Sequence, residues 1–282
     1  MANDTNLIIF ADGPKHSGHV DDVAAARAVA RAATGFASVT LHESAVNKGL
    51  AASIIFGVSQ IFETHDRVIV VEDDIVTAPG FLDYLNQALT AYRKNPRVFA
   101  ACGYSYPPSL VPLPPDYSND VYLSRRPAPW GWATWRDRWA QVDWSVADYA
   151  RFMRDSAARA RFEEGGWDMT GQLRAQMEGR IDSWALRFSY AKLCADAFTV
   201  LPTAALAANI GNDGTGVHCF ATDRYDVALA ESAQSWQFPP DIAPDPRIMR
   251  AFHVGFRPPL SQQLKAFARR QVRRLVPAAP RR

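Results

Sequence analysis

An apolar run that ends in three consecutive carboxylates is the most constraining feature of this sequence. Residues 68–71 are all β-branched, and Glu72, Asp73 and Asp74 follow them directly. Such a run predicts a strand buried on both faces, as in a parallel sheet. The acids would then lie at the carboxyl end of the strand, where open α/β sheets bind ligands. Because side chains alternate along a strand, we expect Glu72 and Asp74 on one side and Asp73 on the other.

Three adjacent carboxylates repel one another unless a cation or hydrogen-bond donors compensate them. Hard oxygen ligands of this kind suit Mg²⁺ or Mn²⁺, which can in turn hold a diphosphate. The competing interpretation is that the acids favour the start of the next helix, which Pro79 would open. The acidic segment alone leaves both interpretations open, so the rest of the chain has to decide.

The composition is that of an ordinary globular protein. The chain has 282 residues, of which 48% are hydrophobic and 21% charged, which fits one α/β domain with an appended lobe. No apolar stretch approaches the roughly 20 residues of a membrane span, and the amino end lacks a signal-peptide pattern, so we expect a cytoplasmic protein. The three cysteines lack metal-type spacing, which argues against a disulfide framework and a structural zinc site.

Strand and helix patterns alternate through the first hundred residues. The expected helices cover residues 20–33, 50–62 and 79–94, and the expected strands cover 7–10, 38–41, 67–71 and 98–102. This alternation predicts a mostly parallel, doubly wound sheet flanked by helices.

The regular alternation of strand and helix patterns ends after Gly103. Several prolines make the following segment irregular, and residues 130–139 hold four of the eight tryptophans. Indole rings can stack on sugars or nucleobases, but a tryptophan-rich core packed against the sheet is an equal alternative. A helix is expected from Ile181 to about Ala195, with Asp182 as its N-cap, and a strand follows at residues 198–201.

A glycine-rich loop and a basic tail complete the chain. Residues 209–218 end in His218, and such a loop can wrap a phosphate through backbone N–H groups, although it matches neither the Walker nor the dinucleotide spacing. No acid follows Asp245, and residues 260–275 alternate apolar and basic positions at helical spacing. We favour an anionic membrane surface as the partner of this tail. A helix docked on its own domain and a nucleic-acid contact are the alternatives, and the lack of interleaved aromatic residues disfavours nucleic acid.

The acidic strand end followed by Pro-Gly-Phe and a helix resembles the metal-binding signature of the GT-A glycosyltransferases. Four further segments occur in the order seen in bacterial family-2-like sugar transferases and in the N-acetylglucosaminyltransferase I type. They are the turn at residues 11–14, the turn at 47–49, the tryptophan block at 130–139 together with 182–184, and the loop at 209–218. The resemblance covers roughly residues 7 to 220.

The resemblance implies a GT-A-like fold and a division of labour along the chain. Residues 1–103 would form the nucleotide-sugar-binding half, 104–245 the acceptor and catalytic half with an irregular tryptophan-rich lobe, and 246–282 the basic amphipathic tail. The reaction implied is transfer of a hexosyl or N-acetylhexosaminyl group from a nucleotide sugar to a glycan or lipid-linked acceptor, with Mn²⁺ or Mg²⁺ as cofactor.

The resemblance also implies roles for the acidic segment and the glycine-rich loop. Asp74 matches the metal ligand, while Glu72 and Asp73 match the acids that hold the ribose and base side of the donor. His218 matches a second metal or diphosphate ligand. The alternative for His218 is a loop histidine without a functional role.

The remaining implied roles concern the acceptor and the sugar donor. Asp182 matches the catalytic base that, in inverting enzymes, takes a proton from the acceptor hydroxyl. Asp12, Lys48 and Trp132 would complete the nucleotide-sugar site. The alternative for Asp182 is a plain helix cap.

One departure from the family leaves a second hypothesis open. Family members usually begin with an additional strand and helix that contribute to the base pocket, whereas six residues precede Leu7 here. Either the chain has lost that half of the donor site, or its start was assigned late, or base contacts come from elsewhere, and Asp12 would supply part of what remains. The second hypothesis is therefore a non-catalytic or truncated protein of this fold that binds a nucleotide or a partner chain. A phosphohydrolase of the haloacid dehalogenase type is disfavoured, because it needs an aspartate where Glu72 stands.

Overall fold

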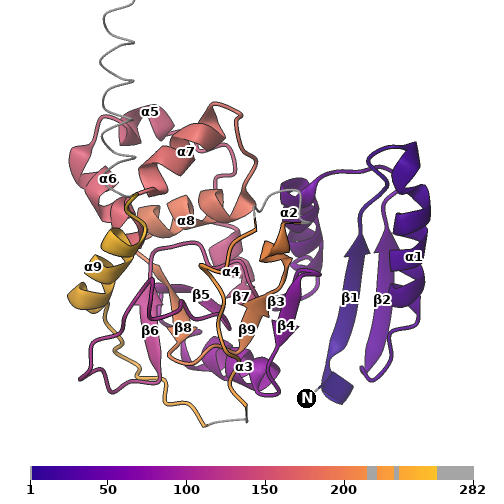
Figure 1. Cartoon of the computed structure of the whole chain (residues 1–282), viewed down its shortest axis with the longest axis horizontal. Coiled ribbons are helices and arrows are strands. Elements are labelled where there is room, and N and C mark those ends of the chain that lie inside the picture. The colour runs from indigo at the N-terminus through magenta and orange to yellow at the C-terminus, as the bar shows by residue number, and fades with distance from the viewer. Residues whose placement is uncertain (1, 215–220, 232–234, 259–282) are drawn as a thin grey trace, which may run out of the picture.

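The computed structural model describes residues 2–214, 221–231 and 235–258 (Figure 1). The protein is a mixed α/β structure in which helices flank a central five-stranded sheet. The strands lie in the order β3-β7-β5-β8-β6. Their bounds are Arg67–Val70 for β3, Trp132–Trp135 for β7, Val98–Cys102 for β5, Phe198–Pro202 for β8 and Val121–Ser124 for β6.

The central sheet contains both parallel and antiparallel pairs, whereas the sequence predicted a mostly parallel sheet. β5 and β8 pair in parallel, whereas β7 is antiparallel to both β3 and β5, and β6 is antiparallel to β8. The α/β class is confirmed. The antiparallel component arises because the tryptophan-rich block supplies β7, which inserts between β3 and β5 with Trp132 opposite both Val70 and Cys102.

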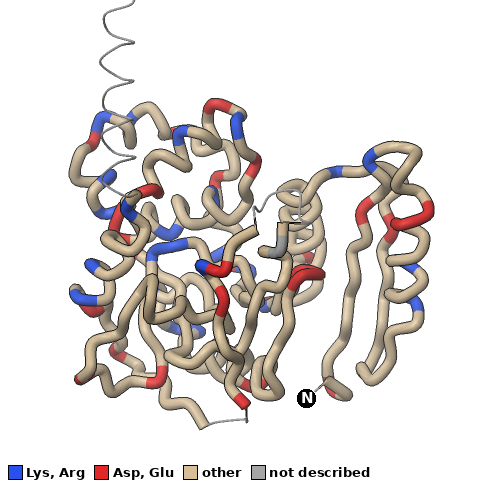
Figure 2. Tube along the Cα trace, viewed as in Figure 1, with Lys and Arg blue, Asp and Glu red and all other residues tan. Residues whose placement is uncertain are grey.

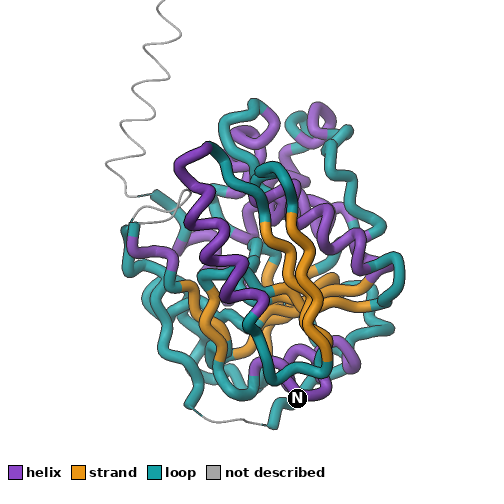
Figure 3. The backbone as a smooth tube through the Cα atoms, turned by 90° about the vertical axis from the view of Figure 1, so that its right-hand side faces the viewer, coloured by secondary structure: helices purple, strands orange, loops and turns teal. Residues whose placement is uncertain are grey.

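The first two strands form a separate sheet instead of extending the central one. β1 (Asn6–Ala11) pairs in parallel with β2 (Ser38–Glu43), with α1 (Val20–Arg31) as the crossover helix. In Figure 3, α1 lies along these two strands, and the strands of the five-stranded sheet cross behind them. None of the residues of β1, α1 and β2 is buried. The apolar β1 residues are thus only half-buried, because two strands and one helix cannot cover both faces of a strand.

A third, two-stranded sheet joins distant parts of the chain. β4 (Ile75–Thr77) pairs antiparallel with β9 (Ala207–Asn209), so that Ile75 lies opposite Asn209. This pairing brings the turn that follows β3 next to the segment that follows β9.

Amphipathic helices cover the central sheet. α3 (Phe81–Ala91) repeats apolar residues at helical spacing, and its buried positions are Phe81, Tyr84, Leu85, Ala88 and Leu89. The other long helices against this core are α2 (Leu50–Ile61) and α8 (Trp184–Cys194). Their observed bounds lie inside the helices predicted from the sequence.

Short helices surround a second apolar cluster that includes Phe152, Phe162 and Leu173. The shorter α-helices are α4 (Arg136–Trp139), α5 (Tyr149–Phe152), α6 (Ser156–Phe162), α7 (Met169–Met177) and α9 (Pro246–Gly255). The 3₁₀ helices are Ala2–Asp4, Ser17–His19, Glu163–Gly165 and Gly211–Asp213.

The carboxyl-terminal part of the chain is described only in part. α9 begins after Asp245, whose carboxylate accepts a hydrogen bond from the Arg247 backbone N–H (2.8 Å). The predicted amphipathic helix at residues 260–275 lies outside the described residues. Within the described ranges, no helix has both the length and the apolar character that crossing a membrane requires.

Candidate functional site

The three acids lie in a turn that follows an edge strand. β3 ends at Val70, and its apolar residues are half-exposed because β3 is the last strand on its side of the sheet. This corrects the prediction of a strand buried on both faces. The acids do not alternate as strand residues would: Glu72 is largely buried, and Asp73 and Asp74 are both exposed. Figure 2 shows the acidic turn on the side of the central sheet that faces the β1–α1–β2 unit.

Glu72 occupies an environment that favours its protonated form. Burial raises its pKa to about 7, a hydrogen bond from the Trp184 side chain acts in the opposite direction, and the charges of Asp73 and Asp74 raise it further. Its Oε1 atom is buried and has no hydrogen-bond partner among the described residues. Glu72 is therefore held close to its titration point near neutral pH, with one carboxyl oxygen buried and without a partner among the described residues.

Asp74 lies directly against the start of the glycine-rich loop. The Ile210 backbone N–H donates to the Asp74 carbonyl oxygen (2.9 Å), and the Gly211 N–H donates to Asn209 Oδ1 (2.7 Å). A Cβ atom at Gly211 would collide with the Asp74 carboxylate, so only glycine allows this approach. The loop and the acidic turn thus form one surface, although Asp74 and Gly211 are 137 positions apart in the sequence.

The next residue along the loop adds an unsatisfied donor to this surface. Asn212 is 6% exposed, and its Nδ2 atom is buried without a hydrogen-bond partner among the described residues. Residues 215–220, which include His218, lie outside the described residues, so the role predicted for His218 stays a prediction. Over the ranges that are described, there is no group of three or more His, Cys, Asp or Glu residues arranged to hold a metal ion.

The amino end of α8 brings Asp182 near the acidic turn. The N-cap of α8 is Ser183, whose Oγ accepts a hydrogen bond from the Leu186 N–H (3.3 Å), so the prediction of Asp182 as N-cap was wrong. The side chain of Asp182 is 65% exposed and forms an ion pair with Arg187 (2.8 Å). Trp184, whose side chain hydrogen-bonds to Glu72, follows Asp182 by two residues, and this connects Asp182 to the acidic turn.

Four tryptophans extend from Glu72 into the core. Trp184 stacks on Trp132 with 4.6 Å between the ring centroids, and Trp132 stacks on Trp139 at 5.9 Å, which in turn contacts Trp144 at 4.7 Å. Trp132 is only 2% exposed. The packing alternative therefore describes Trp132 in this structure, and a direct contact of its ring with a sugar stays a prediction.

Asp12 and Lys48 belong to a separate turn. The Asp12 carboxylate accepts hydrogen bonds from the backbone N–H groups of Gly13, Lys48 and Gly49 at 2.9–3.0 Å. Burial alone would raise the pKa of Asp12, but these backbone hydrogen bonds outweigh it and lower the pKa. The Lys48 ammonium lies 3.9 Å from the centroid of the Phe56 ring. Asp12 thus fastens the end of β1 to the start of α2.

Sequence reasoning missed two members of this surface. Arg187 is the ion-pair partner of Asp182, and its position five residues later on the expected helix was the available signal. Asn212 carries a buried Nδ2 atom that has no partner in the described part of the chain, which only the three-dimensional packing could reveal. The structure brings together the segments at residues 72–74, 182–187 and 209–212.

Comparison with known proteins gives no family for this chain. A scan against protein-family models found no match, and a search of curated proteins found none either.

Proposed function

We propose that this protein is a metal-dependent glycosyltransferase of the GT-A type, which moves a sugar from a nucleotide-diphosphate sugar to a glycan or lipid-linked acceptor. The observation that carries the proposal is the contact of Asp74 with Gly211 at the start of the glycine-rich loop. The same surface includes Glu72 and, through Trp184, the segment of Asp182. Acids for a metal, backbone donors for a phosphate and a separate carboxylate for proton transfer are the groups that displacement at an anomeric carbon requires.

The acidic turn fits a divalent cation of the Mg²⁺ or Mn²⁺ type. Such ions are commonly held by one or two carboxylates together with substrate phosphates, and Asp73 and Asp74 are exposed oxygen donors. The cation, when bound, supplies positive charge beside the departing diphosphate. The nearness of Gly211 to Asp74 supports a diphosphate position beside the acids, at the rim of the loop.

Side chains of the protein would carry out proton transfer and donor binding. In this proposal Asp182 takes the proton from the acceptor hydroxyl, and its ion pair with Arg187 orients the carboxylate. The half-buried Glu72 holds the ribose side of the donor through its unpaired oxygen. An attack assisted by Asp182 from the side opposite the diphosphate makes the reaction inverting. We further propose that the reaction takes place at the cytoplasmic face of a membrane, with residues 260–282 next to the acceptor.

A specific observation favours the second candidate, a protein of this fold that binds a nucleotide or partner chain without catalysis. Asp12, expected to contribute to the donor site, is fully engaged by backbone N–H groups, and the β1–β2 sheet stands apart from the central sheet. A donor site that relies on the first half of the chain would be incomplete with this arrangement.

Calorimetric titration of the purified protein with UDP, GDP and dTDP distinguishes these two functions. Each nucleotide is titrated in the presence of Mn²⁺ and again with a chelator. We expect one nucleotide to bind with Mn²⁺ and to lose its binding with the chelator, because the diphosphate is held through the metal. Absence of binding for all three nucleotides would contradict the glycosyltransferase proposal, and metal-independent binding would favour the non-catalytic alternative.

Gly211→Ala is expected to weaken this manganese-dependent binding at least tenfold while leaving the fold intact. The new Cβ overlaps the Asp74 carboxylate, which can rotate away at little cost in stability but then leaves its position. Gly171→Ala is the matched control, because a Cβ at Gly171 meets open space within α7. The control should bind the nucleotide normally and be equally stable or more stable by up to about 1 kcal/mol. Equal binding by the two variants would show that the loop does not set the position of Asp74.

A further inference from the structure

Lys192 is a buried amine without a carboxylate partner. It lies on α8, is 1% exposed, and its Nζ atom donates to the Arg126 carbonyl oxygen (3.1 Å) and to Thr199 Oγ1 (2.8 Å). No carboxylate of the described residues forms an ion pair with it. A buried ammonium is costly unless an opposite charge compensates it.

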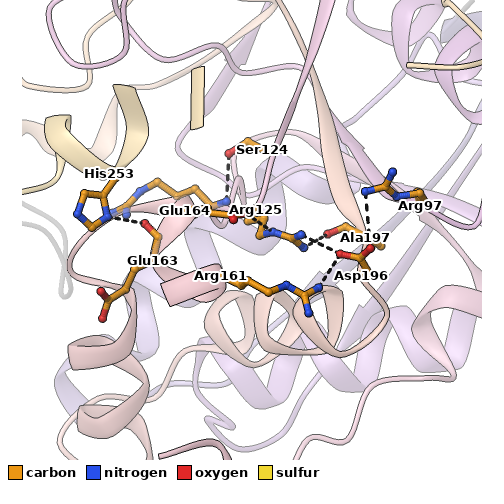
Figure 4. Close-up of polar contacts among 10 residues, drawn as sticks. Arg97, Ser124, Arg125, Arg161, Glu163, Glu164, Asp196, Ala197 and His253 are labelled. Carbon is orange, nitrogen blue, oxygen red and sulfur yellow. Dashed lines mark hydrogen bonds and ion pairs between the residues drawn. The ribbon is translucent and has the colours of Figure 1, made fainter. Parts of the chain in front are cut away.

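The acids nearest to this region are already engaged by arginines. Arg125 binds both Glu164 and Asp196 at 2.8 Å, and Asp196 is shared with Arg161 and Arg97 (Figure 4). Asp168 is likewise engaged by Arg126 at 2.8 Å. Burial, and then the charge of Arg125, lower the pKa of Lys192 to about 7. The surroundings of Lys192 therefore carry excess positive charge.

A small cavity adjoins the amine. Its lining includes Trp132, Ser189, Lys192 and Thr199. Trp132 Nε1 and Ser189 Oγ are buried and have no hydrogen-bond partner among the described residues. An indole N–H and an ammonium can only donate, and a serine hydroxyl can also donate. The cavity thus gathers three donors with one formal positive charge.

We propose that this cavity binds one small monovalent anion of the chloride type. A spherical anion accepts from the indole N–H, the hydroxyl and the third ammonium proton at once, and it compensates the charge of Lys192. The cavity is small, which favours a monatomic anion over phosphate or sulfate.

The proposed anion site is separate from the acidic turn but coupled to it by packing. Trp132, which lines the cavity, stacks on Trp184, whose side chain hydrogen-bonds to Glu72. A bound anion would fix the orientation of the Trp132 indole and support Trp184 from behind. The anion site does not depend on the glycosyltransferase proposal, because its ligand differs, although Trp132 and Trp184 line the cavity and also adjoin the candidate site.

Thermal unfolding of the whole protein in potassium chloride, bromide and gluconate at equal ionic strength tests the proposal. At pH 6, where Lys192 is charged, we expect the two halides to raise the midpoint by roughly 2–4 °C over gluconate, a shift typical of about 1 kcal/mol in a protein of this size. The difference should shrink at pH 9, where a neutral amine no longer needs a counter-ion. Arg125 and Cys102, the other groups that act on Lys192, keep their charge across this range, since burial raises the pKa of Cys102 to about 12. Glu72, which reaches the lining through Trp184, also titrates in this range, so Glu72→Gln is measured in the same salts and should keep the loss of the halide effect at pH 9.

Variants and crystallography test whether the halide effect on the unfolding midpoint arises at this cavity. Lys192→Met and Ser189→Ala should each remove or halve the halide effect, whereas Lys94→Met, which changes an exposed lysine, should retain it. If Lys192→Met does not fold, Ser189→Ala decides. In crystals grown with bromide, an anomalous peak is expected in the cavity, within contact distance of Lys192 Nζ and Trp132 Nε1. Equal midpoints in halide and gluconate, an undiminished effect in Ser189→Ala, or a cavity that holds water only would each overturn the proposal.

Discussion

Asp74→Asn is expected to reduce manganese-dependent nucleotide binding at least about 100-fold without unfolding the protein. The substitution keeps the size of the side chain but removes the charge that a divalent cation requires of its ligand. Asp74 is exposed, so the fold does not depend on burying its carboxylate. Calorimetric titration with the nucleotide that the unmodified protein binds, in the presence of Mn²⁺, measures the loss.

Asp137→Asn provides the matched control for this experiment. Asp137 is also an exposed aspartate, 52% exposed at its side chain, and it pairs with Arg93 and with the buried Arg138 on the α4 side of the sheet. Both variants should unfold within about 2 °C of the unmodified protein. Undiminished binding by Asp74→Asn would remove Asp74 from the metal site, and an equal loss in both variants would point to a general charge effect.

Asp182→Asn is expected to spare donor binding and to slow sugar transfer by roughly 10²–10⁴-fold, the usual contribution of a general base. The amide keeps the shape of the side chain but cannot take a proton from the acceptor hydroxyl. The rate of nucleoside diphosphate release from the donor sugar, with and without acceptor, measures turnover. Titration with the same donor measures binding.

A variant of another exposed carboxylate separates this effect from the loss of a surface ion pair. Glu178→Gln breaks the pair between Glu178 and Arg180, just as Asp182→Asn weakens the pair with Arg187. Glu178→Gln should transfer sugar at the normal rate. Transfer at the normal rate by Asp182→Asn would show that Asp182 is not the base, and weakened donor binding would assign it to the donor side.

The local elements of the fold could be predicted from the sequence, but their pairing could not. Apolar runs and helical spacing located β1, β5, β8 and the helices α2, α3 and α8 to within a few residues. For the residues of β7 the sequence left ligand stacking and core packing as alternatives and predicted no strand, although Trp132 and Trp135 are buried between neighbouring strands. Strand pairing depends on contacts between distant residues, and nothing in the local pattern at residues 132–135 indicates which strands will lie beside it.

The candidate site could likewise be predicted only in its separate segments. The charge of residues 72–74 and the glycines of the loop identified two chemically distinct segments, yet only the β4–β9 pairing places Asp74 against Gly211. The error in the N-cap of α8, predicted at Asp182 and found at Ser183, is a smaller one. Both residue types cap helices well, and the geometry of one turn decides between them. The burial of Trp132 followed from a stack whose members lie far apart in the sequence.

The clamp formed by Asp12 has a consequence for how the molecule opens. The β1–α1–β2 unit contributes no buried side chain from its regular elements, so few apolar contacts oppose its separation from the rest. Because the pKa of Asp12 is lowered in the folded protein, the clamp is at full strength above the ordinary aspartate range and weakens as the pH falls through the lowered value. Acid below the ordinary aspartate range would therefore loosen the attachment of the β1–α1–β2 unit to the start of α2 while the five-stranded sheet keeps its packing, and the molecule would unfold in two stages.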